Sequence, residues 1–82
     1  MSHLFLFVET THMNITEIYD RLLSIMIPNI EYTEIIENDT VLRNAIVVKT
    51  ELSDKELYVE ISDVLPIIGY FDKFTLLRPI KI

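Results

Sequence analysis

An apolar run near the start of the chain predicts the central strand of the fold. Residues 3–8 read His-Leu-Phe-Leu-Phe-Val. This run is too short to span a membrane, and its apolar residues are too continuous for a strand with one face in water. We therefore expect a strand that has a neighbour on each side and that is covered on both faces.

The next stretch has helical periodicity. Its apolar positions recur at intervals of three or four residues, at Ile15, Ile18, Leu22 and Ile25. Asn14 stands before this stretch and is followed three residues later by Glu17, a spacing typical of a capped helix start. Proline does not continue a helix interior, so we expect Pro28 to end the helix. The pattern predicts a main helix over residues 14–27.

Residues 29–37 alternate weakly between apolar and polar positions. Ile30 and Tyr32 fall on one side of a strand, and Glu31, Thr33 and Ile35 fall on the other. Charged residues discourage pairing with further strands, so the segment is typical of a sheet edge.

Two more strands are expected further along the chain. Residues 37–40, Glu-Asn-Asp-Thr, have the composition of a turn. Residues 41–52 contain the run Ala45–Val48, whose β-branched side chains suit a central strand. Residues 73–78 read as a last strand, which Pro79 ends or marks as an edge.

Residues 53–71 allow two interpretations. Leu57, Val59 and Ile61 alternate with polar residues, which favours a strand after a turn at residues 53–55. The same segment also contains a capping box that starts at Ser53, and its apolar residues fit helical spacing as far as Ile68. We favour the strand, because a proline such as Pro66 inside a helix costs about 3 kcal/mol.

These elements predict a single α+β domain over residues 1–82. We expect a small antiparallel or mixed sheet of four to five strands, packed by the main helix and by a short second helix that ends at Gly69. The helical alternative for residues 53–65 changes the order to βαββαβ, the ferredoxin-like arrangement of RNA-recognition and small-molecule sensor domains. Phe5 and Phe7 could then mimic one base-stacking motif, but residues 43–48 supply no aromatic residue for a second.

Composition predicts that the domain associates with itself or with a partner. Half of the 82 residues are hydrophobic, although a domain of this size hides only about 60% of its unfolded surface. We expect a second copy or an obligate partner to cover the excess. The chain has no cysteine and shows neither a targeting peptide nor a membrane span, so we expect a cytoplasmic protein.

The net charge of −6 lies entirely in one half of the chain. Residues 1–42 carry seven acids against Arg21 alone, whereas the acids and bases of residues 43–82 balance. Such a field repels nucleic acid and anionic lipid and attracts basic surfaces. We therefore expect no direct nucleic-acid partner and no membrane.

No motif in the sequence carries catalytic or metal chemistry. His3 and His12 lie at no helical ligand spacing from each other or from an acid, no serine lies in a nucleophile motif, and a single glycine excludes a phosphate-binding loop. We expect a protein that is not an enzyme and that uses no cofactor and no metal.

The hypothesis that remains is a small acidic interaction module that docks on a basic surface of a partner protein. Small acidic phage and viral proteins often act in this way, as inhibitors or as nucleic-acid mimics. The residues expected to contact the partner are Glu31, Tyr32, Glu34, Glu37, Asp39 and Tyr58. The alternatives are a dimeric ferredoxin-like domain that binds a small ligand or RNA, and a structural subunit of a larger complex.

Overall fold

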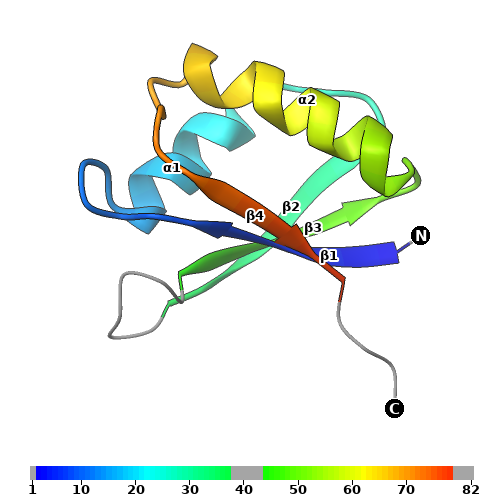
Figure 1. The fold of residues 1–82 in the computed structure, drawn as a ribbon, viewed down its shortest axis with the longest axis horizontal. Coiled ribbons are helices and arrows are strands. Elements are labelled where there is room, and N and C mark those ends of the chain that lie inside the picture. Colours follow the sequence, from blue (N-terminus) through cyan, green and yellow to red (C-terminus); the bar gives the residue numbers. More distant parts are fainter. Residues whose placement is uncertain (1, 38–43, 79–82) are drawn as a thin grey trace.

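The computed structural model describes residues 2–37 and 44–78, which form a two-layer α+β structure (Figure 1). Four strands and two helices follow one another in the order β1 (Ser2–Val8), α1 (Ile15–Leu23), β2 (Ile30–Ile36), β3 (Ala45–Thr50), α2 (Asp54–Ile67) and β4 (Phe74–Leu77). The expected α+β class is confirmed. The turn expected at residues 37–40 lies mostly outside the described residues.

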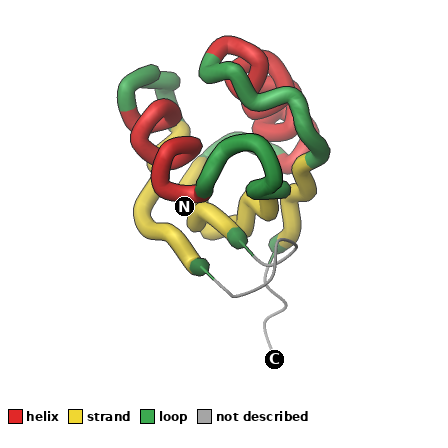
Figure 2. Tube along the Cα trace, turned by 90° about the vertical axis from the view of Figure 1, so that its left-hand side faces the viewer, coloured by secondary structure: helices red, strands yellow, loops and turns green. Residues whose placement is uncertain are grey.

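The strands form one antiparallel sheet in the order β2-β3-β1-β4. This order, with a helix after β1 and another after β3, is the ferredoxin-like βαββαβ topology. The expected positions are confirmed for β1 and β3 at the centre and for β2 at an edge. Both helices lie on the same face of the sheet (Figure 2), and we call the opposite face the open face.

The sequence predicts that β1 is covered on both faces, and within the part of the chain that the structure describes the helices cover one of them. Leu4, Leu6 and Val8 are buried beneath the helices, whereas Phe5 and Phe7 point to the open face and are half-buried. Successive side chains of a strand point to opposite faces, and here the helices cover only one of them. The open face is therefore apolar at its centre without a covering layer of helices.

Helix α1 starts where the sequence predicts and ends earlier. The side chain of Asn14 accepts a hydrogen bond from the backbone N–H of Glu17 (2.8 Å), which caps the first turn. The helix ends at Leu23 rather than at residue 27. There the Ser24 hydroxyl donates to the Arg21 carbonyl (2.6 Å), and the Ile25 N–H bonds to the Leu22 carbonyl in a tighter turn.

The strand favoured for residues 57–61 is wrong, because this segment lies inside α2. The second helix is therefore not short: it has 14 residues, against 9 in α1. Ser53 and Glu56 form a complete capping box, in which the side chain of each accepts a hydrogen bond from the backbone N–H of the other (both 3.2 Å). The helix buries one continuous apolar face, formed by Leu57, Ile61, Val64, Leu65 and, just after it, Ile68. Burial of that face, together with the cap, outweighs the cost of Pro66, which lies exposed in the last turn.

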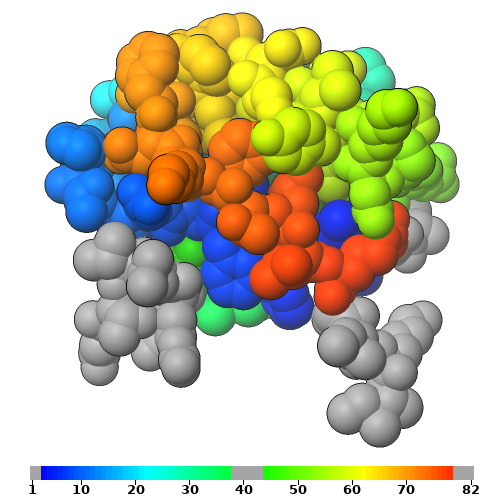
Figure 3. All heavy atoms as spheres, in the orientation of Figure 1, coloured from blue at the N-terminus to red at the C-terminus, as the bar shows by residue number. Residues whose placement is uncertain are grey.

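Gly69 ends this helix segment, as the sequence predicts. It adopts a φ of 89°, and the N–H of Tyr70 donates to the Leu65 carbonyl (2.9 Å) while the N–H of Gly69 donates to the Pro66 carbonyl (3.1 Å). This is a Schellman motif, which requires a left-handed residue that glycine adopts without strain. It turns the chain from α2 into β4, which lies at the surface in Figure 3.

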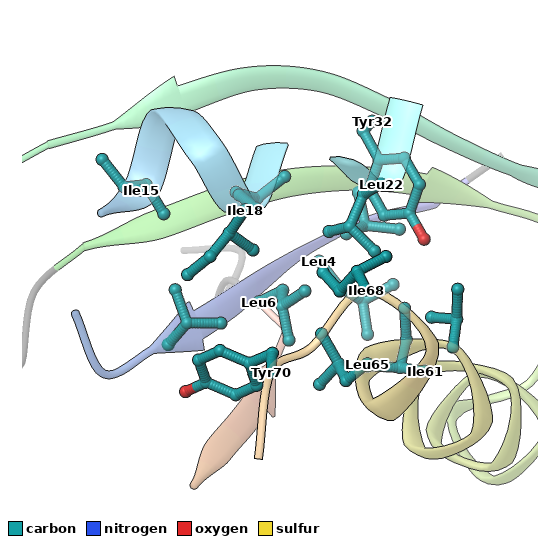
Figure 4. Close-up of a cluster of buried hydrophobic side chains, with 14 of the residues drawn as sticks. Leu4, Leu6, Ile15, Ile18, Leu22, Tyr32, Ile61, Leu65, Ile68 and Tyr70 are labelled. Atoms are coloured by element: carbon teal, nitrogen blue, oxygen red, sulfur yellow. The ribbon is translucent and has the colours of Figure 1, made fainter. Parts of the chain in front are cut away.

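The core lies between the sheet and the two helices (Figure 4). Side chains from β1, β2, α1 and α2 converge there, among them Leu6, Ile18 and Ile61, which are completely buried. Tyr70 closes one side of the core, where its hydroxyl accepts a hydrogen bond from the N–H of Glu9 (2.9 Å) and donates to the Lys73 carbonyl.

Candidate protein-interaction surface

The acids of β2 share the open face of the sheet because the strand contains a β-bulge. In the register, Glu31 lies opposite Lys49 and Glu34 lies opposite Val47, with Thr33 as the extra residue between the paired positions. The Thr33 hydroxyl donates to the Val47 carbonyl (3.3 Å), which holds the bulge against β3. A regular strand would point Glu34 toward the core, so the bulge keeps this charge in water.

The bulge also corrects the sides that the sequence predicts for β2. Ile35 was expected on the side of Glu31, but it lies opposite Ile46 and packs against the core together with Ile30. Ile36 takes the position on the open face instead and is exposed. The insertion of one residue reverses the alternation from that point on.

Tyr32 is a core residue, contrary to the expectation that its ring contacts a partner. Its side chain is 7% exposed and points inward among the buried residues (Figure 4). Burial raises the pKa of Tyr32 to about 12, because the charged phenolate is disfavoured away from water. The hydroxyl is buried and has no hydrogen-bond partner among the described residues.

Tyr58 lies far from the acids of β2. It projects from α2 beside β4, at the opposite edge of the sheet, and its ring stacks on Phe74 with 5.3 Å between ring centroids. Slightly more than half of its surface, 54%, is exposed. The structure therefore assigns the predicted contact residues to different places. Glu31 and Glu34 share one face, Glu37 is exposed directly after β2, Tyr58 lies at the other edge, and Asp39 lies outside the described residues.

The open face also carries an apolar stripe, and none of its residues is among the predicted contact residues. Phe5 and Phe7 meet edge to face on β1, with ring centroids 6.0 Å apart. Their cross-strand neighbours on this face are Val47 and Ala45 of β3 and Leu77 and Thr75 of β4. Exposed Ile36 extends the stripe to the acidic strand. Alternate positions of the opening apolar run are the sequence signal for this stripe.

The electrostatics of the open face differ along its length. At one end, Glu31 lies opposite Lys49, so that opposite charges lie side by side, and His3 follows on the other side of Lys49. Toward the other end, Glu34 stands beside the apolar stripe without a basic residue at its cross-strand position, which is Val47. This half of the face combines apolar area with negative charge.

The described residues hold no cluster of three or more side chains that could bind a metal ion. At the surface, His12 Nδ1 lies 2.9 Å from Asp72 Oδ2 and 3.2 Å from Thr11 Oγ1. The Asp72 carboxylate raises the pKa of His12 through this hydrogen bond. Within residues 2–37 and 44–78, no helix is long and apolar enough to cross a membrane.

Comparisons of the chain with protein-family models, with curated proteins and with solved structures found no match. The likeness to ferredoxin-like domains is therefore one of strand order and connection alone.

Proposed function

We propose that this protein is a non-catalytic interaction module that docks on a basic surface of a partner protein. The observation that supports this function best is the composition of the open face. An open face of an antiparallel sheet usually carries polar residues, but this one carries the half-buried Phe5 and Phe7 at its centre, beside Val47, which is 6% exposed. An apolar centre with a charged margin is the usual anatomy of a protein interface.

The negative charge of the β2 acids favours a partner surface that carries positive charge. Glu34 adjoins the apolar stripe, and Glu31 and Glu37 lie on and just beyond the same strand. Together with the net charge of −6, they favour encounter with a basic surface and accelerate association at low salt. The phenylalanines would supply the desolvated contact area, and the acids would supply specificity.

Reversing the β2 acids is expected to abolish docking. Tagged wild-type protein and the double variant Glu31→Lys/Glu34→Lys would be used to capture proteins from a nuclease-treated lysate, with washes at low and high salt. A partner that binds the wild type at low salt should be lost from the variant. Loss of two favourable charges, with two repulsive ones in their place, should lower retention by about tenfold or more.

The matched control is Asp20→Lys/Asp63→Lys, which reverses two exposed acids on the helices. Each reversal adds two positive units, so both double variants shift the net charge from −6 to −2. The control should retain the partner. Equal capture by all three proteins would contradict docking through the open face.

One observation favours a second function, the binding of single-stranded RNA. The helical α2 and the position of Phe5 and Phe7 on the open face meet the two structural requirements of a ferredoxin-like base-stacking sheet. Both aromatic residues lie on β1, however, and the neighbouring strand β3 presents Ala45, Val47 and Lys49 on this face. Glu31 and Glu34 also repel phosphate.

We expect no measurable binding of a fluorescently labelled single-stranded RNA at low salt, as measured by anisotropy, because the charge of the open face opposes it. Phe5→Ser/Phe7→Ser is the control variant. Binding by the wild type that this double substitution removes would replace the protein-docking proposal with RNA recognition.

A further inference from the structure

The two edges of the sheet are protected to different degrees. Strand β2 carries Glu31, Glu34 and the bulge at Thr33, which are devices that prevent pairing with another strand. Strand β4 reads Phe-Thr-Leu-Leu, has no charged residue, and pairs with β1 in an unbroken register. Its outer side therefore presents backbone N–H and C=O groups to an incoming strand without such protection.

A shallow groove of about 360 Å³ runs between this unprotected edge and α2. Tyr58 and Phe74 stack at its wall, Leu76 lines it, and Arg78 closes one end through an ion pair with Asp54 (Arg78 Nε to Asp54 Oδ1, 2.6 Å). Figure 3 shows β4 across the middle of this side of the molecule, with α2 above it. The edge thus combines unprotected backbone groups with the half-buried Phe74 and Leu76 and the half-exposed Tyr58 on the helix side.

We propose that β4 pairs antiparallel with β4 of a second copy of this chain, around a two-fold axis at Thr75. The two four-stranded sheets would then join into one continuous sheet of eight strands. This dimer does not depend on the function proposed above, because it uses the edge opposite to β2.

The register follows from symmetry and from the sequence of the strand. In a symmetric antiparallel pair, one residue must face its own copy, and the two residues in the middle of β4 are Thr75 and Leu76. An axis at Thr75 places Phe74 opposite Leu76 of the partner subunit and Asp72 opposite Arg78 of the partner subunit. The first pair is apolar and lies on the helix side of the sheet. The second pair is of opposite charge and lies just outside the strand, where Asp72 also bonds to His12.

An axis at Leu76 is less complementary. It places Phe74 opposite Arg78 of the partner subunit and moves Asp72 past the described end of the opposing strand, so that the opposite-charge pair is lost. With the axis at Thr75, the guanidinium of Arg78 can keep Asp54 and still reach a second carboxylate, because it has five N–H donors. This self-complementarity identifies a second copy as the occupant of the edge.

The side chains around the axis account for part of the apolar excess of the chain. Tyr58 and Leu77 are each about half exposed in the monomer, at 54% and 51%. Tyr58 stands over Phe74 next to the proposed axis, so the two copies of this ring would close the grooves on the helix side. Leu77 would lie opposite Lys73 of the partner subunit and cover its aliphatic stem on the open face.

The test places a positive or a negative charge at position 75, next to the proposed two-fold axis. Thr75 is exposed, so Thr75→Lys and Thr75→Glu should both leave the fold intact, which circular dichroism checks. In sedimentation equilibrium, we expect the wild type to form a dimer of twice 9.6 kDa. Each variant alone places two like charges face to face and should raise the dissociation constant by about tenfold or more. A one-to-one mixture of the two variants should restore dimers, because Lys and Glu then face each other.

The matched controls are Thr16→Lys and Thr16→Glu, which make the same changes at an exposed position of α1. Both should dimerise like the wild type. A wild type that stays monomeric across the concentration series overturns the proposal, and so do Thr75 variants that dimerise normally. A mixture that stays monomeric overturns the register centred on Thr75.

Discussion

Leu6→Ala is expected to lower the free energy of unfolding by about 3–5 kcal/mol, the largest effect of any single change considered for this protein. Leu6 has no exposed surface and lies on the central strand, opposite Ile46 on one side and Leu76 on the other. Truncation removes contacts with both neighbouring strands and leaves a cavity under the helices. For a domain of this size, the loss should lower the melting temperature by roughly 15–30 °C.

Leu23→Ala is the matched control for this measurement. Leu23 ends α1 and is 48% exposed, so the same truncation should cost less than about 1 kcal/mol. Urea unfolding of the wild type and both variants would give the three free energies. Similar losses for Leu6 and Leu23 would contradict the assignment of Leu6 to the centre of the core.

The sequence allows most of the fold to be predicted, because periodicity reports which faces are buried. The apolar run of β1, the capped start of α1 and the β-branched run of β3 all lie in the elements expected. Residues 53–68 were ambiguous, since Leu57 and Ile61 fit both a strand and a helix. Tertiary burial of the whole apolar face of α2, rather than local preference, decides between the two.

The candidate site could be predicted only in part, for two physical reasons. The bulge in β2 brings Glu34 to the side of Glu31, and nothing in a simple alternation reveals where an extra residue is inserted. Tyr32 could be read as an amphipathic ring beside acids, but its partners in the core come from distant segments. The run of apolar residues shows that β1 is apolar on both faces, but it does not show that both helices pack on the same face.

The acids of β2 and the outer edge of β4 lie at opposite edges of the sheet, so docking through the acids and pairing through β4 can operate together. Pairing through β4 leaves both β2 strands at the far ends of the eight-stranded sheet, each with Glu31 and Glu34 on the open face. A dimer would present two acidic docking sites and gain avidity for a partner with repeated basic surfaces. The Thr75 variants change the dimer and keep Glu31 and Glu34, although they also place a charge beside Phe7 on the open face.

Tyr70→Phe is expected to destabilise the protein by about 2 kcal/mol, whereas Tyr32→Phe should leave its stability unchanged or raise it by up to about 1 kcal/mol. The two changes delete the same atom from rings that are 3% and 7% exposed. The Tyr70 hydroxyl bonds to the N–H of Glu9 and to the carbonyl of Lys73, and its loss leaves both groups without this partner. The Tyr32 hydroxyl has no partner among the described residues, so its burial costs free energy without a compensating bond.

Urea unfolding of both variants at neutral pH would measure this difference, and equal losses would contradict it. Alkaline pH supplies a second readout, because burial raises the pKa of both tyrosines from 10.0 to about 12. Because the folded pKa lies above the unfolded value, ionisation of these phenols does not affect the free energy of unfolding below pH 10 and lowers it as the pH rises toward 12. Each phenylalanine variant removes one ionising group, so the stability of each should fall less steeply over this interval than that of the wild type. An unchanged slope in Tyr32→Phe would show that this phenol ionises as readily in the folded chain as in the unfolded one, which its place in the core excludes.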